Sequence, residues 1–286
     1  MSAANSVPAV LNADLHCHST YSDGLLAPAE VVRRAHGNGV DLLALTDHDE
    51  LGGLPEARAV ATQLGLRFID GVEVSVSWGA DTTVHVVALN IDPSHAVLIT
   101  GLETVRAGRD ARARAMGEEL DKVGIHGAYA GALTYVRNPA LVGRAHFARF
   151  IAAQGHAKDA KAVFDFWLAK GKPGYIEHAW ASLEQALGWI HAAGGVAVLA
   201  HPGRFRLSNS EFATLLEQFK ALGGDAIEVL SGAHTAQQVS EFAKLARRYG
   251  FAASRASDFH GPGESWIDLG QLPQLPDNLR PVWELF

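Results

Sequence analysis

The stretch that decides the fold reads DLLALTDHD over residues 41–49. Its first half is a short apolar run typical of a buried β-strand, and its second half places His48 directly after that strand. A helical pattern with Pro at its start covers residues 28–38, and another helical pattern covers residues 54–64. Strands that alternate with helices in this way predict an α/β protein with a parallel sheet.

Strand and helix patterns alternate over most of the remaining chain. The predicted strands are residues 11–17, 41–46, 66–77, 82–89, 196–200, 226–230 and 251–254. The predicted helices of the second half are residues 182–193, 210–222 and 235–249. This order of elements is simplest to explain as one barrel-like α/β domain.

Residues 96–175 interrupt the alternation. Strand-like runs disappear there, and Arg, Ala, Glu and Lys recur at helical spacing, as in residues 106–123 and 140–153. A Gly-Lys-Pro-Gly turn at residues 171–174 closes the segment. The predicted organisation is therefore a first barrel part at residues 1–95, an all-helical insertion at 96–175 and a second barrel part at 176–286.

Composition limits the classes of protein that fit. Hydrophobic residues make up 48% of the chain and charged residues 19%, which predicts an ordinary globular core and excludes a disordered chain. A net charge of −7 argues against an extended nucleic-acid surface. No apolar run is long enough to span a membrane, and residues 1–10 have no signal-peptide pattern. A single cysteine, Cys17, allows no disulfide within the chain, so we expect a cytoplasmic protein.

Histidines and acids gather in or just after the predicted strands, and the chain has 14 histidines in all. His16 and His18 are two residues apart, which puts both on one face of a strand. Glu73 lies inside an apolar strand, where an unpaired carboxylate costs several kcal/mol unless a cation compensates it. Because the C-terminal ends of barrel strands converge on one face, the pattern predicts a metal site there. The candidate ligands are His16, His18, Asp23, His48, Glu73, His85, His201, Asp258 and His260.

Four short motifs resemble the signature motifs of the PHP family, the polymerase and histidinol phosphatase domain. They are His16-Cys17-His18, Thr46-Asp47-His48-Asp49, His201-Pro202 and Ser257-Asp258-Phe259-His260. The resemblance implies a distorted, TIM-like seven-stranded (β/α) barrel that holds two or three divalent ions. Mn²⁺ is the expected ion, with Zn²⁺, Fe²⁺ or Mg²⁺ as alternatives, and donor sets of imidazole and carboxylate without thiolate agree with this choice.

The resemblance also implies which residues hold each ion. The implied groups are His16, His18, Glu73 and Asp258 for one ion, Glu73, His85 and His201 for the second, and Asp23, His48 and His260 for the third. Glu73, Asp258 and His201 are the implied catalytic residues. The implied reaction is hydrolysis of a phosphoester by a metal-bridging hydroxide. For Asp47 and Asp49, which adjoin a ligand, a positioning role and an ordinary loop role both stay open.

The helical insertion is expected to act as a lid that carries substrate specificity. Arg144 and His146 lie at a predicted helix start, where backbone N–H groups and a guanidinium bind phosphate well. Lys172 and Arg204 are further candidate phosphate contacts. The arginines of residues 106–114 are expected to form a solvated helix face.

Residues 138–150 resemble the lid of one PHP branch, which contains bacterial 3′,5′-nucleoside bisphosphate phosphatases and a 5′-3′ exoribonuclease. The expected function is removal of the 3′-phosphate from a nucleoside 3′,5′-bisphosphate such as pAp, with lid arginines binding the 5′-phosphate. The alternatives are a 5′-3′ exoribonuclease on short 5′-phosphorylated RNA, and another small phosphatase such as histidinol phosphatase. A non-catalytic metal-binding module and a C–N hydrolase also stay open, although the lid Arg and Lys favour a phosphate-bearing substrate. The expected partner is therefore a small nucleotide or a short RNA.

Overall fold

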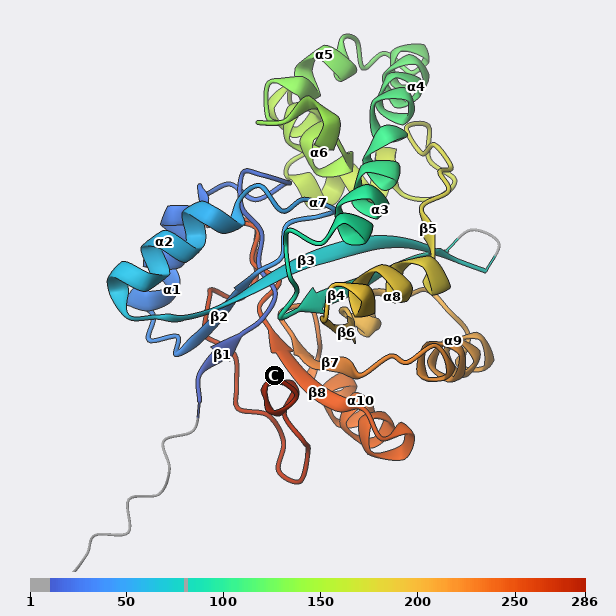
Figure 1. Ribbon diagram of the computed structural model, residues 1–286. Coiled ribbons are helices and arrows are strands. Elements are labelled where there is room, and N and C mark those ends of the chain that lie inside the picture. The colour runs from blue at the N-terminus through green and yellow to red at the C-terminus, as the bar shows by residue number, and fades with distance from the viewer. Residues whose placement is uncertain (1–10, 80–81) are drawn as a thin grey trace, which may run out of the picture.

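The computed structural model describes residues 11–79 and 82–286. The predicted absence of a signal peptide concerns residues 1–10 and lies outside this range. Seven strands follow one another in the order β1-β2-β3-β4-β6-β7-β8, and β5 pairs with β3 beside this path (Figure 1). The strands are β1 (Ala13–Asp14), β2 (Leu42–Leu45), β3 (Arg67–Trp78), β4 (Thr82–Leu89), β5 (Ala181–Ser182), β6 (Val196–Leu199), β7 (Ala226–Ser231) and β8 (Ala252–Ala256).

The two ends of this sheet meet, so the sheet curls into a nearly closed barrel. The amide of Leu15, just after β1, donates to the carbonyl oxygen of Arg255 in β8 at 3.1 Å. Cys17 then forms a bridge with Phe259, just after β8. Only Ala13 and Asp14 of the predicted strand 11–17 form a regular strand, because the chain beyond them pairs at single positions.

β4 departs from the predicted parallel sheet, because it runs antiparallel to both β3 and β6. Only residues 79–81 separate β3 from β4, and so short a connection can only turn the chain back. His85 therefore reaches the barrel end from the middle of a strand, opposite Ser75 of β3. The other neighbouring pairs along the path are parallel, as predicted.

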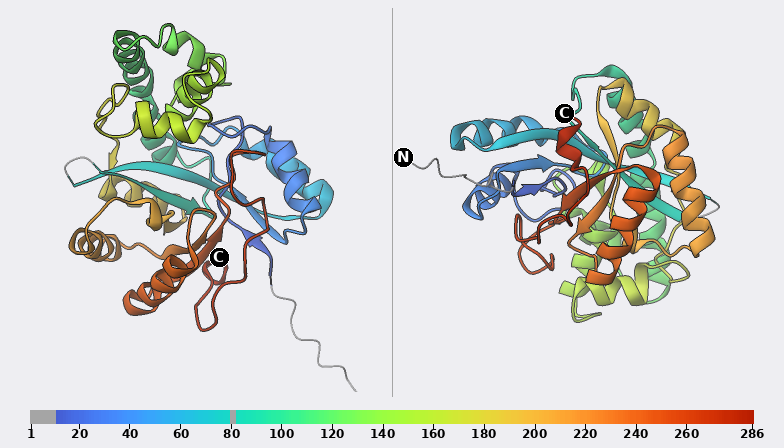
Figure 2. Two further views of the ribbon diagram at one scale, coloured as in Figure 1. Left: turned by 180° about the vertical axis from the view of Figure 1, so that it is seen from behind. Right: turned by 90° about the horizontal axis from the view of Figure 1, so that it is seen from below.

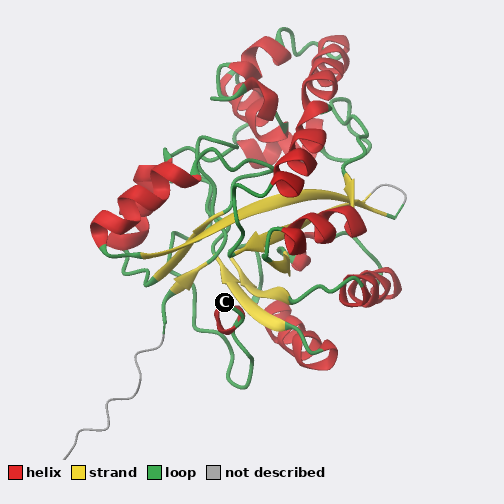
Figure 3. Cartoon of the chain, viewed as in Figure 1, coloured by secondary structure: helices red, strands yellow, loops and turns green. Residues whose placement is uncertain are grey.

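Helices cover the outside of the barrel (Figures 2 and 3). Leu43 and Leu45 of β2 pack with α1 and α2 in one apolar core, and β3, β4, β6 and β7 pack with α8, α9 and α10 in another. A third core, which includes Leu15, Val87 and Val198, is closed by the short helix η4 near the C-terminus. The bounds are α1 (Pro28–Gly37), α2 (Leu54–Leu64), α8 (Leu183–Ala192), α9 (Asn209–Ala221), α10 (Ala236–Tyr249), with the 3₁₀ helices η3 (Pro202–Arg204) and η4 (Val282–Glu284).

The predicted insertion is helical and stands above the barrel end (Figure 1). Its elements are α3 (Ala96–Ala107), α4 (Arg109–Lys122), α5 (Ala128–Leu133), η1 (Pro139–Leu141), α6 (Arg144–Ala153), α7 (Ala160–Val163) and η2 (Phe164–Leu168). Met116, Phe147 and Leu168 belong to a core of its own, whereas Leu98 and Leu102 of α3 pack into the barrel core. The insertion's own core therefore starts in α4. We keep 96–175 as the proposed bounds of the whole insertion, α3 included, and call it the lid below. No described helix is both long and apolar enough to cross a bilayer.

Candidate metal centre

The nine candidate ligands, which lie far apart in the sequence, come together at the barrel end under the lid. Three sets of their potential ligand atoms each lie within 4.8 Å of one another. The sets are His18, Asp23, His48 and His260; His16, His18 and Asp258; and His48, Glu73 and His85. His201 joins them, because its Nε2 lies 2.9 Å from Glu73 Oε1 and 3.3 Å from His85 Nδ1. The structure thus gathers all nine residues into one continuous group, called the nine-residue centre below.

Glu73 lies in the middle of this centre and is fully buried. Its Oε1 lies 2.9 Å from both His85 Nδ1 and His201 Nε2. Its Oε2 lies 2.8 Å from His48 Nδ1 and 3.2 Å from His16 Nε2. Burial opposes ionisation, but the imidazoles of His16, His48 and His85 lower the pKa of Glu73 well below its usual value. Glu73 therefore meets a different set of imidazoles on each of its two oxygens.

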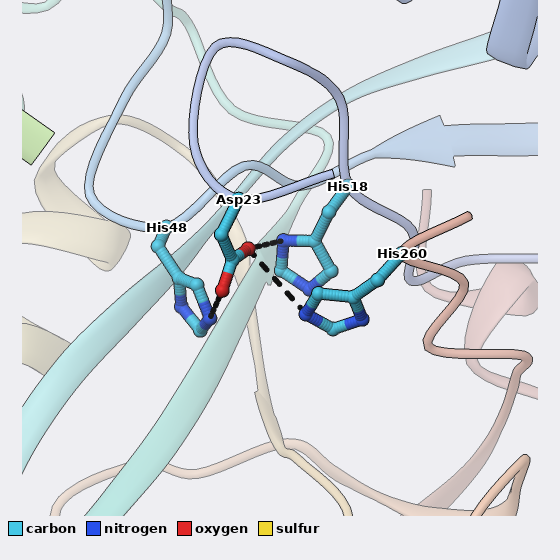
Figure 4. A group of neighbouring side chains, drawn as sticks. All are labelled: His18, Asp23, His48 and His260. Carbon is cyan, nitrogen blue, oxygen red and sulfur yellow. Dashed lines mark ion pairs between the residues drawn. The ribbon is translucent and has the colours of Figure 1, made fainter. Parts of the chain in front are cut away.

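Asp23 contacts the three histidines of its own set, which consists of His18, Asp23, His48 and His260 and is called the outer set below (Figure 4). One of its oxygens lies 3.7 Å from His18 Nδ1 and 3.4 Å from His260 Nε2, and the other lies 3.7 Å from His48 Nε2. Burial and the neighbouring His260 lower the pKa of His18 to about 3, so His18 is a neutral imidazole with a free lone pair. His48 thus presents Nδ1 to Glu73 and Nε2 to Asp23.

Three residues of this region have a positive φ, which is costly for a residue with a Cβ. They are Asp49 (φ 51°), His201 (φ 27°) and Asp258 (φ 54°). Hydrogen bonds from their own amides hold all three in place. Asp49 donates to the Glu73 carbonyl at 2.9 Å, Asp258 donates to the His16 carbonyl at 2.9 Å, and His201 donates to the Glu228 carboxylate at 2.7 Å. The strained backbone is therefore fixed by the same network that positions the ligands.

Glu228, in β7, is a site residue that the sequence analysis missed. It is buried, and its Oε1 accepts a hydrogen bond from His16 Nδ1 at 2.7 Å. Because this bond occupies Nδ1, Nε2 is the ring nitrogen that faces Glu73 and Asp258. A carboxylate inside an apolar strand was the signal that identified Glu73, and the same signal was present at Glu228.

Asp47 and Asp49 both have positioning roles, which answers the question that the sequence left open. Asp47 accepts hydrogen bonds from the amide and hydroxyl of Ser19 at 2.7 and 2.6 Å, and from Ser22 Oγ at 2.6 Å. It thereby fixes the turn that leads to Asp23. Asp49 accepts from both the amide and the hydroxyl of Ser75 at 2.8 Å, so it fixes the His48 loop against β3.

The residues of the centre suit divalent cations. Imidazole and carboxylate donors without a thiolate are the ligands that Mn²⁺, Zn²⁺ and Fe²⁺ accept. Several buried side-chain atoms of the described residues that could ligate a metal also lack a hydrogen-bond partner. Among them are His48 Nδ1, Glu73 Oε2 and His201 Nδ1. His48 Nδ1 and Glu73 Oε2 are only 2.8 Å apart but are not aligned for a hydrogen bond. Buried polar atoms that converge without satisfying one another fit a bound cation.

Lid arginines lie beside this centre, contrary to the solvated helix face that the sequence predicted for residues 106–114. Arg109 is buried, pairs with the Asp49 carboxylate, and lies 4.7 Å over the ring of Trp180. Arg106 donates to the Asp49 carbonyl at 2.5 Å. Arg114 does lie exposed and pairs with Asp110. Helical spacing alone does not show which face meets the barrel, and this is why the prediction was wrong for Arg106 and Arg109.

Arg109, Arg112 and Arg144 form a cluster of positive charge, called the arginine cluster below. Burial, and then the positive charges of Arg144 and Arg109, lower the pKa of Arg112 to about 10. Arg112 donates to the Ile176 carbonyl at 3.1 Å, and Arg144 lies 5.8 Å over the Phe164 ring. Neither Arg112 nor Arg144 has a carboxylate partner among the described residues. The cluster therefore carries more positive charge than its surroundings neutralise.

The four candidate phosphate contacts have different surroundings. Arg144 starts α6 within the arginine cluster. His146 is buried, its Nδ1 accepts from the Gly143 amide at 3.1 Å, and its Nε2–H donates to the Ser22 carbonyl at 3.1 Å, so neither ring nitrogen is free. Arg204 pairs with Asp258 Oδ2 at 2.6 Å and is 48% exposed. Lys172 is exposed in the turn after η2, with no described hydrogen bond or ion pair to the nine-residue centre.

Comparisons with known proteins agree with the fold and the centre. Residues 14–191 match the PHP domain family. A 3′,5′-nucleoside bisphosphate phosphatase from Chromobacterium violaceum is 50% identical over 95% of each chain. A 5′-3′ exoribonuclease from Haemophilus influenzae is 40% identical over 96% of this chain and 98% of its own.

A solved structure, described as an amidohydrolase from Chromobacterium violaceum with bound SO4 and no metal, superposes with a TM-score of 0.93. It is 50% identical in sequence, and the match covers 96% of this chain and 95% of that one. The predicted barrel with a helical insertion is thereby confirmed. Both the family match and these relatives extend over most of the sequence, and the chain therefore belongs to the PHP domain family.

Proposed function

We propose that this protein is a metal-dependent phosphoesterase that removes the 3′-phosphate from nucleoside 3′,5′-bisphosphates and yields a nucleoside 5′-monophosphate. The names of the two similar enzymes support hydrolysis of a phosphate ester of a nucleotide. One observation in this chain favours a substrate with a second phosphate. Arg112 and Arg144 have no carboxylate partner among the described residues, and they are coupled to Arg109, which its ion pair with Asp49 joins to the loop of His48. A dianionic 5′-phosphate is the group that such a cluster would bind.

The nine-residue centre would hold two or three divalent ions, with Mn²⁺ as our first choice. Ions held in this way supply Lewis-acid activation of water and neutralise charge on the phosphate oxygens. Glu73 would contribute one oxygen to each of two ions, and Asp258 and His201 would complete their ligand sets at the barrel mouth. We propose these three as catalytic residues because Glu73 contacts imidazoles through both of its oxygens, His201 lies 2.9 Å from Glu73, and the partly exposed Arg204 pairs with Asp258.

Arg204 would act at the rim of the same site. It holds Asp258 Oδ2 at 2.6 Å, and almost half of its side chain faces solvent. A guanidinium has five N–H donors, so Arg204 can keep this carboxylate and also donate to a phosphate oxygen. Lys172 lies on the exposed turn after η2, and we keep it as a proposed contact to the substrate.

Arg144 would be the principal contact to the 5′-phosphate. It belongs to the first turn of α6, where backbone N–H groups have no intrahelical partner and favour an anion. Arg109 is held rigidly by Asp49 and the Trp180 ring, so it gives the cluster a fixed position relative to His48. His146 is bonded on both nitrogens, so we assign it no phosphate contact in this arrangement.

A 5′-3′ exoribonuclease is the second candidate function. The 40% identity to such an enzyme favours it, and a 5′-phosphate would be held in the same way in both reactions. The net charge of −7 favours small substrates, so we propose a mononucleotide or a short RNA as the partner. Cleavage of a C–N bond is disfavoured because the arginine cluster favours a phosphate-bearing substrate. We further propose a cytoplasmic location, in keeping with the single buried thiol.

Product analysis tests this proposal. Mn²⁺-loaded protein would be given pAp, 3′-AMP and a 5′-phosphorylated pentaribonucleotide in separate reactions. Release of phosphate and AMP from pAp, with much slower hydrolysis of 3′-AMP, would support the bisphosphatase and its 5′-phosphate contact. Mononucleotides from RNA with pAp left intact would make the exoribonuclease the function. No reaction with any of the three would refute both.

Two single arginine variants, one at the proposed phosphate site and one outside it, sharpen the test. Arg144→Met should raise KM for pAp about 10- to 100-fold, as expected for loss of one or two charge-assisted hydrogen bonds, and should leave KM for 3′-AMP unchanged. Arg114→Met, on the exposed side of the lid, is the matched control and should behave like wild type. An unchanged KM for pAp in Arg144→Met would remove Arg144 from the phosphate site.

A further inference from the structure

One lid side chain ties together two loops that carry candidate ligands. Arg149, in α6, is buried and donates to the backbone carbonyl of Asp23. Its Nε and Nη2 also bind the two carboxylate oxygens of Glu264 at 2.8 and 2.7 Å. Glu264 lies in the turn directly after His260, and in that turn the His260 amide donates to Ser265 Oγ at 2.7 Å. Arg149 thus connects the loop of Asp23 with the loop of His260.

His146, one turn earlier on α6, supports the Asp23 loop from the same side. Its Nε2–H donates to the Ser22 carbonyl at 3.1 Å. The lid therefore binds the carbonyl on each side of Asp23, that of Ser22 and that of Asp23 itself. Bonds at two successive peptide groups leave the Asp23 side chain little freedom to turn away from His18, His48 and His260.

The lid also holds the third loop, which carries His48. Arg106 and Arg109 bind the carbonyl and the carboxylate of Asp49, the residue next to His48. Among the described residues, the lid helices form no hydrogen bond or ion pair with His85, His201 or the residues next to them. The contacts of the lid are thus concentrated on the loops of one set, His18, Asp23, His48 and His260, which is the outermost of the three sets.

We propose that the lid completes this outer ion site, and that Arg149 and His146 are positioning residues for it. The proposal rests on the metal centre proposed above. The loops of Asp23, His48 and His260 share no strand, so their ligands hold a common geometry only if something fixes the loops relative to one another. A pre-formed ligand set binds an ion more tightly because less freedom is lost on binding. By reciprocity, an ion in the outer site should stabilise the docked position of the lid.

Metal stoichiometry tests this directly. Wild type, Arg149→Met, His146→Ala and the exposed-face control Arg114→Met would be dialysed against buffers of defined free Mn²⁺, and bound Mn²⁺ would be measured by elemental analysis. We expect Arg149→Met and His146→Ala to bind one ion about 10- to 100-fold more weakly than wild type, with the remaining ions unaffected. The control should match wild type. Full occupancy with unchanged affinity in both variants would overturn the proposal.

Two further measurements separate this coupling from general damage to the lid. Glu264→Ala removes the partner of Arg149 from the barrel side and leaves the lid itself intact, so it should weaken the same ion if the loops must be tied. In wild type, Mn²⁺ should slow amide hydrogen exchange in α6, and Asp23→Ala should abolish this effect. Exchange in α6 that does not respond to Mn²⁺ in wild type would also overturn the proposal. If wild type binds no Mn²⁺ at all, the proposed function fails first.

Discussion

Glu228 gives the sharpest test of how the candidate ligands are held. It contacts two residues of the nine-residue centre but is not itself one of the nine. Its Oε1 accepts from His16 Nδ1 and its Oε2 accepts from the His201 amide, both at 2.7 Å. The first bond sets the tautomer and ring orientation of His16. The second holds His201 in its left-handed backbone conformation. Glu228→Ala removes both, and Glu228→Gln keeps the shape but offers only one acceptor oxygen to the two donors.

The expected losses follow from these two bonds. A hydrogen bond to a charged group contributes about 1.5–3 kcal/mol, so losing two of them should lower the free energy of unfolding by roughly 3–6 kcal/mol. Glu228→Gln should lose about half of that. Metal affinity should fall by about 10- to 100-fold, the usual effect of removing a carboxylate that orients a histidine ligand, which corresponds to about 1.4–2.7 kcal/mol.

Two assays would measure these losses. Urea unfolding of the metal-free protein gives the change in stability, and Mn²⁺ titration against a chelating dye gives the change in affinity. Glu217→Gln, an exposed glutamate on α9, is the matched control and should change neither. If Glu228→Ala bound Mn²⁺ as tightly as wild type and kept its kcat/KM, the assigned role of Glu228 in orienting His16 would be refuted.

Three other perturbations have expected outcomes that follow from the described contacts. Arg109→Met leaves the buried Asp49 carboxylate without its cation and should lower the free energy of unfolding by about 3–5 kcal/mol, with partial recovery in the double variant Arg109→Met/Asp49→Asn in urea titrations. Burial, opposed in part by Asp23, lowers the pKa of His146 to about 4. The unfolded chain, with a pKa near 6.5, therefore binds more protons between these values, and stability should fall by about 3 kcal/mol as pH drops from 6.5 to 4. This dependence should be shallower in His146→Gln, and equal slopes would contradict the assignment. Glu73→Ala should abolish activity and lower the Mn²⁺ content together. Full activity in this variant would refute the assignment of Glu73 as a metal ligand.

The sequence predicted the nine-residue centre because its residues follow a local rule. A polar residue at or just after an apolar strand is visible without knowledge of the fold, as at His48 after β2, and strand ends of a barrel converge on one face. Glu73 stood out because an apolar strand gives a carboxylate no partner. Glu228 obeyed the same rule and was overlooked, since no short motif marked it.

Other features depend on contacts between distant segments. The antiparallel direction of β4 is not one of them, because the predicted strands 66–77 and 82–89 already left only four residues between them, and the sequence analysis overlooked what so short a connection implies. Arg109 read as a surface residue because its helix has a polar pattern, and only docking of α4 against Asp49 buries it. The two ring nitrogens of His146 form hydrogen bonds with the Gly143 amide and the Ser22 carbonyl. Ser22 is 124 residues away, so no spacing in the sequence predicts that bond.

The pinned position of Arg109 bears on the choice between the two candidate functions. Asp49 joins Arg109 to the loop of His48, and its amide also bonds to the carbonyl of Glu73 at 2.9 Å. The arginine cluster therefore stands at a fixed distance from the centre, with no flexible linker between them. In the proposed reaction the scissile phosphate lies one nucleoside away from the 5′-phosphate. Both pAp and the first linkage of a 5′-phosphorylated RNA meet this condition, so the arginines cannot be what separates the two reactions. The separation must arise beyond the 3′-phosphate, where RNA continues and pAp ends, and contacts at the rim near Arg204 are the first place to look for it.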